Sequence, residues 1–255
     1  MKKTATFAVV AAMLMTMSAC RHHYEVTSVE RTRILIDSRW DAQPDAQANA
    51  FLAPYKHDVD SVLGPVLGHV ARNMTVDRPE SMLSNLLPDI LIWASQFYNE
   101  QPVFAVYNMG GIRADLTRGA VTYGDVLDIA PFENKIAFTT LSGETVLELF
   151  QQIAARGGEG VSSAVRMVIT KDGKLLSATL NGEKIDPSKD YRVATIDYLL
   201  GGNDKMPAFM KGRDVVSPQE VSNNTRFLIM DYFRSFEKEG KMVDAKIEGR
   251  IVVKE

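Results

Sequence analysis

The sequence has 255 residues, a formal net charge of −3 at pH 7 and a single cysteine. This charge gives the molecule no long-range basic field, so we expect no nucleic-acid polymer as a partner. Any phosphate site must therefore depend on local positive charges. One cysteine excludes an intramolecular disulfide, and the length fits one large domain or two small ones.

The first residues form a targeting signal. Lys2 and Lys3 precede an apolar run from Ala5 to Met15, which is too short to span a bilayer, and small residues then lead to Cys20. We predict a lipoprotein signal peptide over residues 1–19 and lipidation of Cys20. The alternative is ordinary cleavage beside an incidental cysteine. Lipid chains would anchor an exported bacterial protein to a membrane, in the periplasm or at the cell surface, with the outer membrane favoured.

Two regions follow the signal. Residues 20–56 are predicted to be a lipidated tether and N-terminal extension, and residues 57–255 the folded domain. The extension has an apolar patch at Ile34–Ile36 that indicates a strand, and Asp45–Tyr55 has Ala and Phe at helical spacing.

The next segments build the first half of the domain. Residues 58–74 fit a helix or a strand, because two glycines and a proline interrupt the apolar pattern. Ser81 is a plausible cap for a helix that runs to Tyr98, and Pro88 inside it predicts a kink or a late start. An apolar run at 102–106 predicts a buried strand.

Helices and strands then alternate. A short helix is predicted at 123–129, a strand at 136–141 and a helix at 143–155. Two runs at 166–170 and 175–180 flank a Lys-Asp-Gly-Lys turn and predict a hairpin.

The C-terminal part adds a strand at 192–196, a helix from Ser217 or Pro218 that ends before Gly240, and a last strand at 245–253. Because hairpins are interspersed among helices, the sequence favours an α+β class, a mixed β-sheet with flanking helices, over a doubly wound parallel sheet.

The segment Tyr107–Arg113 is the most informative stretch of the chain. Asn108, two glycines and Arg113 follow directly after the predicted strand at 102–106. Glycines let a backbone approach a ligand closely, and the guanidinium suits phosphate, carboxylate or ribose oxygens. Alone, this segment also fits an ordinary turn between a strand and a helix.

Three further blocks accompany it, Arg78–Asp89, Gly119–Asn134 and Ala194–Asp204. In this order, the blocks resemble the C-terminal domain of the 5'-nucleotidase / UDP-sugar hydrolase family, with its patterns R-x-E-S-x-L-G-N-L, N-G-G-G-I-R, T-Y-G-D-V with P-F-x-N, and N-D-F-L-x-x-G-G-D. The resemblance covers about residues 57 to 253 and implies the α+β fold of that domain.

The resemblance also implies a ligand site. Two aromatic rings would sandwich a nucleobase, and Phe132 and Tyr198 match their positions; the alternative is that both are core aromatics. Base stacking tolerates different bases. The substrate-binding residues that the resemblance implies are Arg78, Asn108, Gly111, Arg113, Phe132, Tyr198 and Asp204.

The sequence departs from the family pattern at three of these places. Tyr198 replaces the commoner Phe and adds a hydroxyl. Asp204, expected to accept hydrogen bonds from ribose hydroxyls, follows Gly-Gly-Asn, so Asn203 is expected to adopt the left-handed conformation. Arg78 lies one residue further from Asn85 than in some members, and its alternative is a solvated arginine before a helix.

The catalytic half of the family's enzymes is not recognised here. Those enzymes hydrolyse phosphate esters with two metal ions in a preceding metallophosphatase domain, and its signatures D-x-H and G-N-H-E do not occur in this sequence. We therefore predict no catalytic or metal-binding residue and no cofactor in this chain, with divalent metals expected only in a partner metallophosphatase. His57 and His69 lack nearby carboxylates at metal-ligand spacing, and Asp125 and Asn134 are expected to hold turns.

Three functions fit these observations. The chain is expected to be the nucleotide-binding subunit of a split 5'-nucleotidase-type phosphohydrolase, inactive alone, whose dimetal domain is a separate chain. Alternatively, it is a non-catalytic lipoprotein that captures nucleotides or nucleosides. A third possibility, an interaction module with a dead site, is disfavoured because the spacing of Asn108 and Arg113 is intact.

Overall fold

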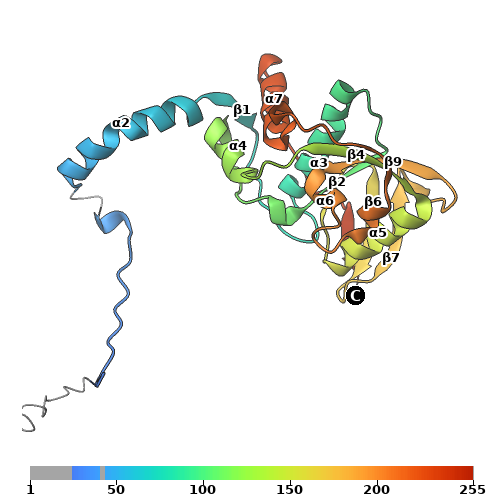
Figure 1. Ribbon diagram of the computed structural model, residues 1–255, viewed down its shortest axis with the longest axis horizontal. Coiled ribbons are helices and arrows are strands. Elements are labelled where there is room, and N and C mark those ends of the chain that lie inside the picture. The colour runs from blue at the N-terminus through green and yellow to red at the C-terminus, as the bar shows by residue number, and fades with distance from the viewer. Residues whose placement is uncertain (1–24, 41–43, 255) are drawn as a thin grey trace, which may run out of the picture. The chain divides into compact units, whose positions relative to one another are not determined.

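The computed structural model describes residues 25–40 and 44–254 (Figure 1). The chain divides into two units, Met1–Phe51 and Leu52–Glu255. The predicted signal peptide and Cys20 lie outside the described residues. No helix within the described ranges has the length and apolar character needed to cross a membrane.

The described part of the N-terminal unit contains a short 3-10 helix, η1 (Ser38–Trp40), and the first turns of helix α2 (Ala46–Leu63). The strand predicted at Ile34–Ile36 does not form, so that prediction is wrong. Ile36 is 93% exposed, and a strand needs a neighbour to pair its backbone groups. The apolar patch alone could not supply one.

The segment that fitted a helix or a strand contains both. Helix α2 continues to Leu63, and the chain then enters strand β1 (Val66–Val70). A Cβ on Gly64 would lie 2.5 Å from the Asp60 carbonyl oxygen, so glycine is required where the helix ends. The predicted boundary between residues 56 and 57 falls inside α2, and it stays a prediction.

The central sheet is mixed. Its order is β10-β4-β9-β2-β5, with β2 and β9 parallel and the other neighbours antiparallel. The strands are β2 (Phe104–Tyr107), β4 (Ile136–Ser142), β5 (Gly160–Val161), β9 (Asp190–Ile196) and β10 (Arg213–Val216).

Two smaller sheets complete the strands. One pairs β1 with β3 (Gly119–Thr122), and the other has the order β11-β6-β7-β8. The predicted hairpin is confirmed, because β6 and β7 are antiparallel. The strands of this sheet are β6 (Val165–Thr170), β7 (Leu175–Leu180), β8 (Glu183–Lys184) and β11 (Ile251–Lys254).

The last strand is shorter than predicted and runs parallel to β6. Residues 245–250 remain outside it. Arg250 is 3% exposed and donates hydrogen bonds to the Asn85 and Val161 carbonyl oxygens and to the Asp89 carboxylate. These contacts fix the chain before the strand begins.

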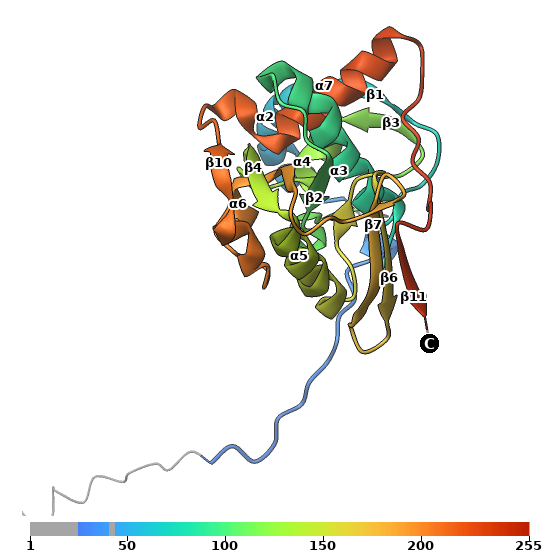
Figure 2. The ribbon, with the colours of Figure 1, turned by 90° about the vertical axis from the view of Figure 1, so that its right-hand side faces the viewer.

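Helices cover both faces of the central sheet (Figure 2). The Phe104 ring contacts Phe150 of α5 at 5.4 Å, and the Phe138 ring contacts Tyr98, just after α3, at 5.6 Å. Phe104 pairs with Val193 and Phe138 with Ala194, so their side chains point to opposite faces.

The α-helices after α2 are α3 (Met82–Ala94), α4 (Tyr123–Ile129), α5 (Gly143–Ala155), α6 (Asp197–Leu200) and α7 (Thr225–Lys238). The 3-10 helices after η1 are η2 (Ser95–Tyr98), η3 (Met109–Gly111), η4 (Pro207–Lys211) and η5 (Val221–Asn223).

Helix α3 begins at its predicted cap. The Ser81 hydroxyl accepts from the Ser84 N–H at 3.3 Å, and the Ser84 hydroxyl accepts from the Ser81 N–H at 2.8 Å. The late start predicted from Pro88 is wrong, because the helix runs through this proline. The buried apolar face of α3 offsets the one backbone hydrogen bond that proline cannot donate.

Helix α7 begins later than predicted, at Thr225 rather than at Ser217 or Pro218. The Thr225 N–H donates to the Asn134 carbonyl at 2.8 Å and so ties the helix start to the loop before β4. Gly240, with φ of 65°, follows its end as expected. The whole domain is thus α+β with mixed sheets and flanking helices, as predicted.

Candidate functional site

Three loops meet at one edge of the central sheet. Because β2 and β9 are parallel, the residues that follow them emerge at the same edge. Strand β4 is antiparallel to β9, with Ile136 opposite Ile196, so the loop before β4 lies there too. The motifs at 107–113, 131–134 and 194–204 are therefore brought together by the strand order.

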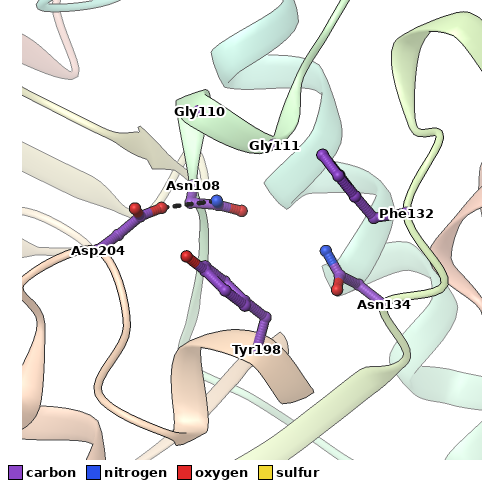
Figure 3. Close-up of a pocket in the computed structure, with 7 residues that line it drawn as sticks. All are labelled: Asn108, Gly110, Gly111, Phe132, Asn134, Tyr198 and Asp204. Carbon is purple, nitrogen blue, oxygen red and sulfur yellow. Dashed lines mark hydrogen bonds between the residues drawn. The ribbon is translucent and has the colours of Figure 1, made fainter. Parts of the chain in front are cut away.

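These loops enclose a cavity of about 190 Å³. A cavity of about 150 Å³ is known to hold benzene, so the space accepts one aromatic ring system. Phe132 and Tyr198 stand on opposite sides of it (Figure 3), with 47% and 39% of their surfaces exposed. The lining residues are Asn108, Gly110, Gly111, Phe132, Asn134, Tyr198 and Asp204.

Hydrogen-bond acceptors mark one side of the cavity. The Asn108 amide donates through Nδ2 to Asp204 Oδ2 at 2.7 Å. Its Oδ1 is buried and has no hydrogen-bond partner. Since Asp204 is also an acceptor, this side of the cavity suits a ligand that carries hydroxyl or amine donors.

Gly111 makes room for this arrangement. A Cβ at this position would lie 2.7 Å from Asn108 Oδ1, closer than real Cβ contacts come. The Asn108 side chain cannot easily retreat, because it is buried and bonded to Asp204. A glycine is thus required for the amide to keep its place in the cavity wall.

The two predicted arginines lie beside the cavity, outside its lining. Arg78 donates from Nη2 to Glu159 Oε1 at 2.8 Å. Arg113 is exposed, and its Nη1 donates to the Gly110 carbonyl at 3.3 Å. The structure thus brings five of the predicted residues into the lining: Asn108, Gly111, Phe132, Tyr198 and Asp204.

The prediction for Asn203 is wrong. Among the described residues, positive φ values occur at Gly202 (74°), Asp204 (53°) and Lys205 (58°), and Asn203 is not among them. Its Nδ2 instead donates to the Tyr198 carbonyl at 2.7 Å. Asp204 itself takes the left-handed conformation, which Asp tolerates better than most residues.

Asp125 and Asn134 were expected to hold turns. Asp125 does so, because its Oδ2 accepts from the Thr122 N–H at 2.7 Å and from the Thr122 hydroxyl at 2.6 Å, which caps α4. Asn134 differs: its carbonyl accepts from Thr225, while its side chain lines the cavity. The sequence reasoning therefore missed Asn134 as a site residue.

It also missed Arg156 and Glu159. Glu159 is buried and accepts from the Met109 N–H at 2.6 Å, directly after Asn108. The signal was the segment Arg-Gly-Gly-Glu-Gly at 156–160, where two opposite charges stand among glycines. Burial raises the pKa of the Tyr107 phenol, so this residue before Asn108 stays neutral at neutral pH.

No group of three or more His, Cys, Asp or Glu side chains that could hold a metal ion is present within residues 25–40 and 44–254. His69 contacts a single carboxylate, with Nδ1 2.9 Å from Glu237 Oε2.

Several known proteins are similar to this chain in sequence or in fold. Protein UshA of Escherichia coli is 26% identical over 204 residues, which cover 79% of this chain and 36% of UshA. The cell wall protein Lmo0130 of Listeria monocytogenes is 26% identical over 236 residues, covering 83% and 30%. The crystal structure of a 5'-nucleotidase precursor from Thermus thermophilus superimposes with a TM-score of 0.70 at 25% identity, covering 84% of this chain and 44% of that chain.

The chain thus spans 36% of the length of UshA and less of Lmo0130. The model of the family "5'-nucleotidase, C-terminal domain" matches residues 64–211, more than half of the sequence. The chain belongs to the 5'-nucleotidase C-terminal domain family.

Proposed function

We propose that this domain binds nucleosides and nucleotides in the cavity at the sheet edge. The base would stack between Phe132 and Tyr198, and ribose hydroxyls would donate to Asp204 and to Asn108 Oδ1. The observation that carries the proposal is the pair of half-exposed rings facing a cavity of about 190 Å³ beside a buried acceptor without a partner. Such rings bind any base, so loose base specificity is expected.

Calorimetric titration of the purified protein tests this proposal. In metal-free buffer, adenosine and AMP should each bind with one site per chain and should raise the melting temperature as their concentration rises. Absence of both heat and thermal shift at millimolar ligand would refute the proposal.

We further propose that the domain serves as the substrate-holding subunit of a split phosphohydrolase. The dimetal centre would be supplied by a separate metallophosphatase chain. Support comes from the family match, which is to a C-terminal domain. The partner's bound metals would activate the water that attacks the phosphate ester.

Helix α2 is the proposed contact for that chain. It directly precedes the matched region and has no buried residue. Leu52, Val59 and Val62 fall on one side of the helix and are 54%, 52% and 62% exposed. An exposed apolar row of this kind suits a partner surface.

Mixing provides the test of the split enzyme. A metallophosphatase lipoprotein from the same organism, with divalent metal, should hydrolyse AMP faster when this protein is added. Equal rates with and without it would favour the second candidate, a lipoprotein that captures nucleosides without chemistry. The described lining favours this second candidate in one respect, since it contains no lysine or arginine.

We also propose export and lipid anchoring through Cys20. The sequence of the N-terminus supports this, and one relative is named a cell wall protein. Metabolic labelling with palmitate should mark the wild-type protein and leave a Cys20→Ser variant unlabelled; equal labelling of both would exclude Cys20 as the acceptor.

A further inference from the structure

A closed ring of polar contacts stands behind the acceptor side of the cavity. Glu159 Oε2 accepts from the Met109 N–H at 2.6 Å, and Glu159 Oε1 accepts from Arg156 Nε at 2.5 Å. Arg156 Nη2 lies 3.7 Å from Asp204 Oδ1, and Asp204 Oδ2 accepts from Asn108 Nδ2 at 2.7 Å. Asn108 precedes Met109 in the chain, so the ring returns to its start.

The Glu159 side chain is completely buried, with 0% exposed, against 18% for Arg156 and 22% for Asp204. A buried carboxylate is costly unless it is paired. Here Arg78, Arg156 and a backbone N–H all donate to it. Charge-assisted bonds of this type are short and directional, so Glu159 fixes both the loop after β2 and the Arg156 guanidinium.

The loop after β2 and the Arg156 guanidinium each help to position one hydrogen-bond acceptor of the cavity. The Met109 N–H belongs to the residue after Asn108, and its bond to Glu159 sets the position of the Asn108 backbone. Arg156 approaches the Asp204 oxygen that Asn108 does not use. The ring includes neither Phe132 nor Tyr198, which are placed by the loop before β4 and by α6.

We propose that Glu159 is a positioning residue that determines ribose recognition. This role rests on the proposed nucleoside binding. The ring of contacts through Glu159 and Arg156 would select for the ribose hydroxyls, and the aromatic pair would stack the base. The carboxylate does not touch the ligand. It acts by holding the two acceptors, Asn108 Oδ1 and Asp204, in place on one side of the cavity.

The test compares two ligands that share a base. Adenosine and 2',3'-dideoxyadenosine are titrated into the wild-type protein and into Glu159→Gln, a substitution that retains the shape and removes the charge. The wild type should prefer adenosine by about tenfold or more, as expected when two hydrogen bonds are lost. Glu159→Gln should lower adenosine affinity by about tenfold and change dideoxyadenosine affinity by less than about twofold.

Glu100→Gln is the matched control. Like Glu159, Glu100 accepts two hydrogen bonds from guanidinium groups, in its case both from Arg192 at 2.7 and 2.6 Å, and its side chain is 15% exposed. Because Glu100 belongs neither to the cavity lining nor to the ring of contacts behind it, this variant should keep the preference for adenosine. Melting temperatures of both variants separate lost stability from lost recognition.

Arg156→Gln gives a second route if Glu159→Gln does not fold, because it breaks the same ring at a partly exposed residue. It should also abolish the preference for adenosine. An unchanged preference in Glu159→Gln, or in Arg156→Gln where only that variant folds, would overturn the proposal, as would an equal loss for both ligands. If the wild type bound neither ligand, the proposed function itself would fail.

Discussion

Phe132 and Tyr198 leave large parts of their rings exposed, whereas the other aromatic residues between positions 57 and 254, Phe97 apart, are buried or partly buried. Exposed aromatic surface forgoes the stabilisation that burial gives. The two rings face the same cavity, so a planar ligand between them would recover that stabilisation on both faces. Their exposure in the free protein is therefore what stacking recognition requires.

Phe132→Ala should weaken adenosine binding by roughly 1–3 kcal/mol, the usual worth of stacking one base on an aromatic ring. Phe97→Ala is the control, since Phe97 is 62% exposed and does not line the cavity. Calorimetry of both variants checks this. Equal affinity in the two variants would contradict the assignment of Phe132.

The pKa of Asp172, in the turn between β6 and β7, gives a second testable prediction for a single residue. Lys174 and the Thr170 hydroxyl lower the pKa of its carboxyl to about 2, from an ordinary value of 3.8. The depressed pKa means that the ionised carboxylate stabilises the folded turn above pH 3.8. This contribution is lost as the pH falls through about 2.

An NMR titration of the Asp172 carboxyl should report this low value in the wild type. In Lys174→Ala, the pKa should rise toward 3.8, because the larger cause of the shift is gone. The same titration of Asp186, whose pKa is lowered by Ser188, serves as the internal reference and should not move. A Lys174→Ala titration identical to the wild type would show that the ion pair is absent in solution.

Among the elements, α3 depends on its reciprocal cap. Ser81→Ala removes the oxygen that accepts the Ser84 N–H and leaves this donor in a buried site. The free energy of unfolding should fall by about 1 kcal/mol, within the range for lost helix caps. Ser177→Ala, at an exposed position of β7, should change it little. Denaturant unfolding measures both, and equal effects would argue against the cap.

How far the sequence predicted these elements depended on local signals. Helices α4 and α5 have side-chain caps and continuous apolar faces, so their limits were predicted correctly. The start of α7 was not, because it is set by a bond to Asn134, which is distant in the sequence. The strand predicted at Ile34–Ile36 failed for the converse reason, since its apolar residues found no partner strand.

In the candidate site, too, residues in local motifs were predicted and residues placed by distant contacts were not. The family resemblance identified Asn108, Phe132 and Tyr198, whose motifs follow or precede recognisable strands, and all three line the cavity. Glu159 could not be assigned from the sequence, since its role arises from contacts with residues up to 81 positions away. Arg78 was assigned to the substrate, yet the structure pairs it with Glu159.

At the scale of the whole molecule, we expect no hydrolysis by this chain alone. Purified and supplied with divalent metal, it should not cleave AMP or UDP-glucose, because arginine contacts cannot replace a metal-activated hydroxide in so slow a reaction. A phosphate-release assay checks this. Metal-dependent turnover that survives removal of contaminating phosphatases would contradict it.

A variant in α2 tests the partner contact. Val59→Asp places a charge in the exposed apolar row and should reduce the gain in AMP hydrolysis when the metallophosphatase chain is added. His57→Asp is the matched control, because it places the same charge on the other side of the helix. Both variants should bind adenosine normally. Equal gains for the two variants in the mixing assay would place the contact elsewhere.

The most direct test of the central claim is a crystal structure of the protein with adenosine. We expect the adenine ring to lie between Phe132 and Tyr198, with ribose hydroxyls within hydrogen-bond distance of Asp204 and Asn108 Oδ1. Adenosine bound elsewhere, or an empty cavity at saturating adenosine, would contradict it.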